Sequence, residues 1–296
     1  MLKKKLGLIS LVLFVIVFAL TGCSGGDESA AIRVSNQTWT EASIIGHITE
    51  KMITENTDYE VERIELESTV LQWNAINNDQ IDIWPDYTSS LFNVFEDDDT
   101  VLYEPDAVYD YVLDKAKTDY NLIMLERMGF YNNYDLAVTP EAAAEYDLKT
   151  YSDLAAVSDQ LAIAADANFK DREDCYPLLQ ANYDMNFNEI YQMSVAAKFT
   201  AVENGEAEVV ACYTTDAGIS RLGLVVLEDD KHANMHFDAV YILRSEILEQ
   251  YPDLEELLNK VKITNEEMAA MNLQVEGEKR TPDAVAQEFL EEKGLI

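Results

Sequence analysis

Short apolar segments alternate with amphipathic segments along most of this 296-residue chain after residue 31. The apolar segments have the length of strands and lie at 32–34, 61–66, 81–84, 122–124, 135–138, 161–164, 209–212 and 225–227. Helical patterns separate them, which is typical of α/β architecture. Two such α/β units follow each other without a linker, so we expect two lobes with a ligand cleft between them.

Capping and breaking residues predict where several elements begin and end. Thr38 and Glu41 fit a capping box, with Thr38 as the N-cap and Glu41 at the third helical position. Pro85 should end the strand at 81–84, because a proline has no N–H to donate within a sheet. Pro282 begins the last helix and Gly294 ends it. The first helix should bury one apolar face, made of Ile44, Ile45, Ile48 and Met52.

The start of the chain has the pattern of a targeting segment. Three lysines, at positions 3–5, precede an apolar run at 6–20, which is the arrangement of a signal peptide. The tetrad Leu-Thr-Gly-Cys that ends at Cys23 resembles the bacterial lipobox, whose cysteine is diacylated and becomes the first residue after cleavage. This resemblance implies a lipoprotein signal peptide at 1–22, a lipid on Cys23 and a flexible tether at 23–31.

The alternative to a cleaved signal peptide is an uncleaved membrane anchor. The apolar run at 6–20 is shorter than the roughly 20 apolar residues that a spanning helix needs, which disfavours that alternative. We therefore expect the mature protein at the extracytoplasmic face of the cell membrane, held there by acyl chains.

The charge of the chain limits its partners. It carries 56 Asp and Glu against 21 Lys and Arg, a formal net charge of −35. Nucleic acid and anionic membrane surfaces would repel such a protein, so we expect neither as a partner. A neutral or cationic small molecule is the expected partner, and a hydrophobic content of 48% excludes a disordered chain.

The sequence offers little catalytic chemistry. It lacks a dinucleotide-binding glycine motif, a P-loop, a zinc-protease motif and a nucleophile elbow. His47, His232 and His236 show no metal-ligand spacing. Cys175 and Cys212 could form a disulfide outside the cytoplasm, although two buried thiols without a bridge are the favoured interpretation. We therefore expect a binding protein without cofactor or metal, and no enzyme.

A series of motifs then follows in order along the chain. They are Gln-Thr-Trp-Thr-Glu at 37–41, Asp-Gln-Ile-Asp-Ile-Trp-Pro-Asp-Tyr-Thr-Ser-Ser at 79–90, Asn-Asn-Tyr-Asp-Leu-Ala-Val at 132–138, Tyr-Thr-Thr-Asp at 213–216 and Leu-Val-Val-Leu-Glu-Asp-Asp at 224–230. Together they resemble the glycine betaine/carnitine/choline-binding lipoproteins of ABC osmoprotectant importers. The similarity runs from about residue 32 to the end of the chain.

This resemblance implies a bilobal periplasmic-binding-protein fold of type II. Lobe I would comprise residues 32–132 and 238–296, and lobe II residues 133–237. The chain would cross between the lobes near 131–135 and 236–240, and these two segments would form the hinge about which the lobes close on a ligand.

The resemblance also implies an aromatic cage for a trimethylammonium group. Such a cation has no N–H to donate, whereas the faces of aromatic rings attract its diffuse charge. The cage positions of the family fall on Tyr87, Tyr134, Tyr213 and Phe237. Phe237 replaces the usual tyrosine, so it keeps the ring face and lacks the hydroxyl. Trp39 and Trp84 flank the same motifs and are either further cage walls or core residues.

The carboxylate of a betaine needs a cationic or polar partner. Arg172 occupies the family's arginine position and could hold the carboxylate through two parallel hydrogen bonds. Its alternative role is a surface salt bridge with Glu173 or Asp174. Gln37 and Ser90 could add polar contacts from the opposite lobe.

The sequence therefore predicts a monomeric substrate-binding protein that delivers glycine betaine, carnitine or choline to an ABC permease and its ATPase. The role could be osmoprotection or nutrient uptake. One alternative is a different cationic or sulfur-containing betaine, which Phe237 and Cys175 make plausible. The other is an exported enzyme on the same scaffold, which the missing catalytic motifs disfavour.

Overall fold

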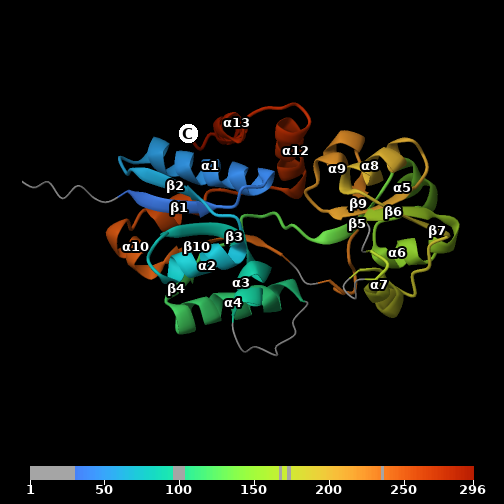
Figure 1. Ribbon diagram of the computed structural model, residues 1–296, viewed down its shortest axis with the longest axis horizontal. Coiled ribbons are helices and arrows are strands. Elements are labelled where there is room, and N and C mark those ends of the chain that lie inside the picture. Colours follow the sequence, from blue (N-terminus) through green and yellow to red (C-terminus); the bar gives the residue numbers. More distant parts are fainter. Residues whose placement is uncertain (1–30, 96–103, 167–168, 172–174, 235–236) are drawn as a thin grey trace, which may run out of the picture. The chain divides into compact units, whose positions relative to one another are not determined.

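The computed structural model describes residues 31–95, 104–166, 169–171, 175–234 and 237–296, and it is mixed α/β (Figure 1). Its strands form two separate five-stranded sheets with helices packed around each. We call the regions built around the two sheets lobe I and lobe II. The predicted α/β architecture with two lobes is confirmed.

Several predictions fall on residues outside the described ranges. They are the signal peptide at 1–22, the lipid on Cys23, nearly all of the tether and the proposed carboxylate partner Arg172. Within the described ranges, none of the helices combines the length and the apolar character that crossing a membrane requires.

The sheet of lobe I consists of β1 (Ile32–Asn36), β2 (Val61–Glu65), β3 (Ile83–Tyr87), β4 (Leu122–Met124) and β10 (Ala239–Arg244). Their order in the sheet is β2-β1-β3-β10-β4. β1 runs parallel to β2 and β3, whereas β10 is antiparallel to β3 and β4. Because β10 returns from late in the sequence, lobe I is built from two separate segments of the chain.

The sheet of lobe II consists of β5 (Tyr134–Val138), β6 (Ala162–Asp166), β7 (Glu189–Met193), β8 (Val209–Tyr213) and β9 (Val225–Val226). Their order is β7-β6-β8-β5-β9. β6 is parallel to β7 and β8, whereas β5 is antiparallel to β8 and β9. In the β5–β8 pair, Tyr134 lies directly opposite Tyr213.

Two segments of the chain, at 125–133 and 227–238, connect the two sheets, and we call them the crossing segments. They lie side by side: the backbone N–H of Asn132 donates to the carbonyl of Phe237 at 3.2 Å, and Tyr131 forms a bridge with Asp238. The predicted lobe boundaries at 132/133 and 237/238 fall within these segments. Where one lobe ends and the other begins stays a prediction.

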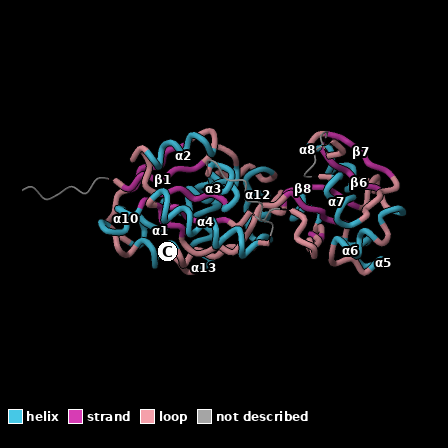
Figure 2. Tube along the Cα trace, turned by 90° about the horizontal axis from the view of Figure 1, so that it is seen from below, coloured by secondary structure: helices cyan, strands magenta, loops and turns pink. Residues whose placement is uncertain are grey.

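The helices of lobe I are α1 (Thr40–Asn56), α2 (Thr69–Asn77), α3 (Thr88–Val94), α4 (Pro105–Tyr120), α10 (Ser245–Gln250), α11 (Leu254–Leu258), α12 (Asn265–Glu276) and α13 (Pro282–Lys293). In Figure 2 its strands lie between α2 on one side and α1 and α13 on the other. Two apolar clusters fill these layers, one on each face of the sheet. The predicted apolar face of the first helix, Ile44, Ile45, Ile48 and Met52, is buried in the larger cluster.

Lobe II contains the helices α5 (Pro140–Tyr146), α6 (Tyr151–Ala155), α7 (Tyr176–Tyr183), α8 (Val195–Glu203) and α9 (Ala217–Leu222), and a short 3₁₀ helix, η1 (Ser158–Gln160). Cys175 and Cys212 are buried in two different apolar clusters of this lobe. No disulfide joins these two described residues, as the favoured interpretation predicted. α9 packs against α12, so the two lobes touch there (Figure 1).

The predicted capping box at the first helix is wrong. α1 begins at Thr40, and its N-cap is Trp39, which makes no side-chain capping bond. Glu41 does not reach back to the helix start, because Tyr87, Asn132 and Asn272 all donate hydrogen bonds to its carboxylate. The last helix follows its prediction: the Thr281 hydroxyl caps α13 and Gly294 ends it with φ 66°.

Pro85 does not end its strand, because it lies inside β3. It pairs with Tyr241 of β10, whose carbonyl accepts a hydrogen bond from Leu125 at 2.9 Å on the opposite side. In an antiparallel pair only every second position exchanges hydrogen bonds across the ladder. At this position β10 needs no N–H from β3, and β1 pairs with β3 at Val34 and Ile83, before Pro85. A proline is therefore tolerated at this point of a central strand.

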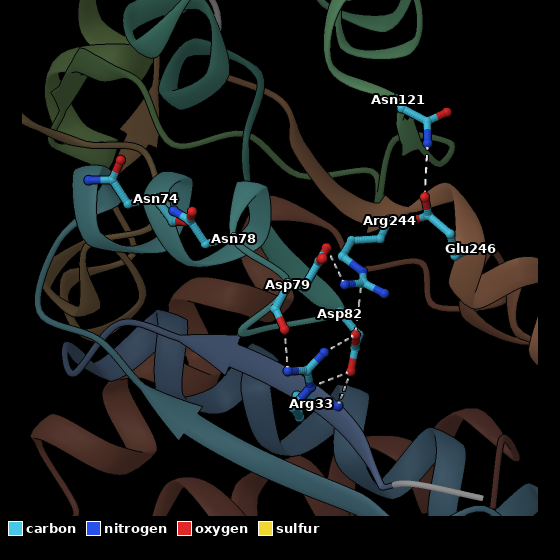
Figure 3. A network of polar contacts seen from close by, with 8 residues as sticks. All are labelled: Arg33, Asn74, Asn78, Asp79, Asp82, Asn121, Arg244 and Glu246. Carbon is cyan, nitrogen blue, oxygen red and sulfur yellow. Dashed lines mark hydrogen bonds and ion pairs between the residues drawn. The ribbon is translucent and has the colours of Figure 1, made fainter.

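Charged side chains join three strands at the end of the lobe I sheet remote from the crossing segments (Figure 3). The Arg33 guanidinium donates to the Asp82 carboxylate from Nε at 2.9 Å and from Nη2 at 2.7 Å. Arg244 forms ion pairs with Asp79 and, at 3.5 Å, with Asp82. Because Arg33 belongs to β1, Asp82 precedes β3 and Arg244 ends β10, this network stabilises the strand order locally.

Candidate functional site

A cavity of about 400 Å³ lies beside the crossing segments and is lined by both lobes. Its walls are Gln37, Trp39, Glu41, Asp86, Tyr87, Ser90, Asn132, Tyr213, Thr215, Asp216, Ala217, Phe237, Asn272 and Glu276. This volume is in the range of pockets for small molecules. The cavity therefore fits the expected kind of ligand site.

Five residues proposed from the sequence meet in this cavity. They are Tyr87, Tyr213, Phe237, Gln37 and Ser90. They arrive together because β3 and β8 both end at the crossing segments, so Tyr87 and Tyr213 lie at the last positions of their strands. Tyr134 is not among the lining residues, and Arg172 lies outside the described ranges.

Lobe I contributes a stacked aromatic pair. The rings of Trp39 and Tyr87 are 6.3 Å apart at an angle of 25°. Tyr87 is buried, whereas Trp39 is 39% exposed. Trp84 is fully buried in the core and donates its indole N–H to Asp86 at 2.8 Å. The two tryptophans that flank the motifs thus separate into one cavity wall and one core residue.

Lobe II contributes a more open aromatic pair. Tyr213 is 45% exposed, and its ring centroid lies 5.3 Å from that of Tyr134. The Tyr134 hydroxyl donates to Asp166 at 2.6 Å. Burial is the larger cause and this bond the second cause of a raised pKa of Tyr134. The ammonium of Lys198 lies 5.8 Å from the centroid of the Tyr134 ring. Tyr134 therefore supports Tyr213 and already has a protein cation near its own ring.

Glu41 is a cavity residue that the sequence reasoning missed as a site residue. Its side chain is almost fully buried, at 1% exposure. The Tyr87 hydroxyl, the Asn132 amide at 3.0 Å and the Asn272 amide at 2.9 Å all donate to its carboxylate. Burial raises the pKa of Glu41, and hydrogen bonds, first from Thr215, lower it in part. The signal was present, since Glu41 closes the first motif, but the capping interpretation concealed it.

Asp86 is the second buried carboxylate that the sequence reasoning missed. It accepts hydrogen bonds at 2.8 Å from the Trp84 indole, the backbone N–H of Tyr87 and the Ser90 hydroxyl. Burial raises the pKa of Asp86, and the bond from Ser90 is the largest opposing influence. The Ser90 hydroxyl, proposed as a contact for a ligand carboxylate, therefore already donates to an anion of the protein.

The charges around the cavity are mostly negative. Glu41, Asp86, Asp216 and Glu276 line it, and no Lys, Arg or His of the described ranges does. Asp216 forms an ion pair, because the buried Lys198 ammonium lies 3.6 Å from its carboxylate. Aromatic faces and carboxylates both attract a cation. The described part of the cavity is therefore suited to a positively charged group.

A larger cavity, of about 560 Å³, lies next to other residues of the same segments. It is lined by Tyr131, Asn133 and Thr214, which alternate in the sequence with Asn132, Tyr213 and Thr215 of the first cavity. Its lining contains none of the residues proposed from the sequence. In the described ranges, no group of His, Cys, Asp and Glu is arranged to hold a metal ion.

Residues 30–292 match the family described as the substrate-binding domain of the ABC-type glycine betaine transport system. The chain belongs to this family. The predicted resemblance is confirmed, and the protein is a substrate-binding protein of this class of ABC transport system.

Two relatives illustrate the range of this family. The carnitine transport binding protein OpuCC of Listeria monocytogenes is 30% identical over 304 residues, covering 100% of this chain and 99% of the relative. The ergothioneine transport permease/ergothioneine binding protein EgtU of Helicobacter pylori is 35% identical over 183 residues, covering 61% of this chain and 33% of the relative. Both names describe transport proteins, in agreement with the expectation of a binding protein.

The fold agrees with solved structures of the same class. A crystal structure described as that of a glycine betaine/carnitine/choline ABC transporter superposes with a TM-score of 0.84 at 27% identity, covering 89% of this chain and 99% of the other. The substrate-free YehZ of Escherichia coli superposes with a TM-score of 0.82 at 20% identity, covering 90% and 100%. The bilobal binding-protein fold predicted from the sequence is thereby confirmed.

Proposed function

We propose that this binding protein captures a quaternary ammonium compound, namely glycine betaine, carnitine or choline, and delivers it to an ABC permease with its ATPase. The observation that carries the proposal is the cavity between the lobes, in which aromatic rings and buried carboxylates meet. A trimethylammonium group offers methyl groups and diffuse positive charge but no hydrogen-bond donor. Ring faces and nearby anions therefore suit it better than a set of hydrogen-bond acceptors alone.

The proposed cage uses rings from both sides of the cavity. Tyr87 and Trp39 form the wall on lobe I, Tyr213 forms the wall on lobe II, and Phe237 belongs to a crossing segment. Tyr134 acts behind Tyr213, to which it holds an edge-on ring contact. A rotation about the crossing segments would bring Tyr213 closer to a ligand seated on Tyr87.

The carboxylate end of a betaine has fewer partners in this proposal. Arg172 is its proposed cationic partner, and Gln37 is a polar one. The Ser90 hydroxyl donates to Asp86, so it serves a ligand carboxylate only after turning away from that bond. The location completes the proposal: a monomer at the extracytoplasmic face of the membrane, anchored through a lipid on Cys23.

Calorimetric titration of the mature chain tests the ligand class. We expect binding of at least one of glycine betaine, carnitine and choline, each added to the protein freed of co-purified ligand by unfolding and refolding. The matched comparison is the binding of choline to the Arg172→Ala variant, because choline lacks the carboxylate. Loss of glycine betaine affinity with retained choline affinity is expected for this variant, and absence of binding by all three ligands rejects the proposal.

A second candidate ligand is ergothioneine. The observation that favours it is the 35% identity to the Helicobacter pylori protein named for ergothioneine binding. Ergothioneine carries a trimethylammonium group as well, so the same cage would receive it. Titration with ergothioneine beside the other three ligands separates the candidates: tighter binding of ergothioneine than of all three would replace the first assignment.

A further inference from the structure

Two of the carboxylates that line the cavity lie in opposite surroundings. Glu41 is almost completely buried, at 1% exposure, whereas Glu276 at the end of α12 is exposed to solvent. A charge acts more strongly through a low-dielectric interior than through water, where salt also screens it. Of these two anions, Glu41 is therefore the one able to act strongly on a cation in the cavity.

The surroundings of Glu41 are arranged for an ionised carboxylate. Asn132 and Asn272 present their NH₂ groups to it, and the Tyr87 hydroxyl donates as well. The carbonyl oxygens of both amides are buried without a hydrogen-bond partner among the described residues. In each amide the NH₂ group faces the carboxylate, and this orientation leaves the amide oxygen without a hydrogen bond in the described part of the chain.

The contact between Glu41 and Tyr87 joins this anion to the proposed cage. A phenol that donates to a carboxylate gains electron density, so the face of its ring attracts a cation more strongly. The same network reaches lobe II, because the Asn272 amide also donates to the backbone carbonyl of Thr215 at 2.9 Å. The hydrogen bond between Tyr87 and Glu41 thus fixes the position of the ring and places the carboxylate behind it.

We propose that Glu41 is the residue that makes this cavity select a cation over a neutral molecule of the same shape, acting through the ring of Tyr87. The proposal rests on the proposed function, since it takes the trimethylammonium group to lie on that ring. Glu41 is a positioning and specificity-determining residue in this role: it supplies negative charge behind the cage wall, and its bonds hold the wall in place.

The test compares choline with 3,3-dimethylbutan-1-ol, in which a tert-butyl group replaces the trimethylammonium group. Both molecules have the same shape, and only choline is charged. In the Glu41→Gln variant we expect choline affinity to fall roughly 10- to 100-fold, as for the loss of a desolvated charge, with about a twofold change or less for the neutral alcohol. A purely structural role of Glu41 would weaken both ligands equally and would overturn the proposal.

Glu276→Gln is the matched control, because it removes a carboxylate from the same cavity at an exposed position. Its choline affinity should fall several-fold less than that of Glu41→Gln, since water and salt screen an exposed charge. If the neutral alcohol binds too weakly to measure, the choline affinities of Glu41→Gln and Glu276→Gln are compared with each other. Equal choline affinities of these two variants reject the proposal.

Tyr87→Phe gives a second variant that keeps both the ring and the carboxylate. It breaks the hydrogen bond through which Glu41 acts. Its choline affinity should therefore lie between that of the wild type and that of Glu41→Gln. In the Tyr87→Phe background, Glu41→Gln should then cost less than it does alone. Fully additive losses would show that Glu41 does not act through Tyr87. A wild-type protein that binds none of the quaternary amines would refute the proposed function itself.

Discussion

The two walls of the cavity differ in how completely they are built before a ligand arrives. On lobe I, Tyr87 is buried, and its hydroxyl and backbone N–H are bonded to Glu41 and Asp86. On lobe II, Tyr213 is 45% exposed and its ring rests on Tyr134. Binding costs less when the groups are already ordered. The difference indicates a rigid wall on lobe I and a more open wall on lobe II. Under the proposed function, the rigid wall receives the ligand and the open wall closes over it.

Tyr87→Ala is expected to have the largest effect, because Tyr87 serves both the core and the cavity. Truncating a buried aromatic side chain costs about 3–5 kcal/mol of unfolding free energy, and Glu41 would also lose a donor. Chemical unfolding measures the stability loss, and calorimetry should detect no choline binding. Tyr87→Phe is the control, which should keep most of the stability. Unchanged stability in Tyr87→Ala would contradict the description of lobe I as the rigid wall.

Lys198→Met tests the support behind the lobe II wall. Lys198 is buried at 1% exposure, and its removal leaves Asp216 without the cation 3.6 Å away. Breaking a buried ion pair in this way costs about 3 kcal/mol or more, so we expect a lower midpoint of thermal unfolding.

The double variant Lys198→Met, Asp216→Asn provides the control for this experiment. It removes both charges and should recover a large part of the lost stability, because no unpaired charge stays buried. An equally unstable double variant would show that Lys198 acts through packing rather than through its charge.

Tyr213→Ala should separate binding from stability. Its side chain is 45% exposed, so the unfolding free energy should change far less than in Tyr87→Ala, by about 0.5 kcal/mol. Choline affinity should nevertheless fall roughly 30-fold, because a desolvated cation–π contact contributes about 2 kcal/mol. Tyr191 is the matched control, since it is 40% exposed on β7 and lies outside the cavity. If Tyr191→Ala weakens choline binding as much, Tyr213 is no cage wall.

The smallest expected effect is a pH dependence of stability that arises from Glu41 in the rigid wall. Burial raises the pKa of Glu41 above 4.5, so the folded protein takes up this proton at a higher pH than the unfolded chain. As the pH falls through the raised pKa towards 4.5, the wild type should therefore gain stability relative to Glu41→Gln, by about 1.4 kcal/mol for each pKa unit of the shift. Urea unfolding of both proteins across this pH range measures the difference. A difference that does not vary with pH would contradict a raised pKa.

Much of lobe I could be predicted from local signals. The face of α1 was readable because apolar residues recur at helical spacing, and α13 because Thr281, Pro282 and Gly294 mark its ends. Pro85 was misread because its effect depends on which side of the strand carries hydrogen bonds. That side is set by β10, a strand more than a hundred residues away that the sequence patterns did not reveal.

The candidate site divides in the same way. Tyr87, Tyr213 and Phe237 were found because they lie in motifs that resemble a known family. Asp86 was not, because among 56 acidic residues nothing in the sequence distinguishes a buried carboxylate from an exposed one. Glu41 closes the first motif, but it was assigned to a helix cap. Burial, hydrogen-bond partners and pKa are properties of the folded surroundings.

The sequence by itself determined the α/β alternation, the family and most of the rings at the cavity, because periodicity and motifs are local properties of the chain. Only the tertiary structure decided the surroundings of Glu41. That carboxylate receives hydrogen bonds from β3, a crossing segment and α12, which span residues 87–272 of the chain. Only folding brings these donors together, and only then does a residue with the pattern of a helix cap become a buried charge beside a ligand cavity.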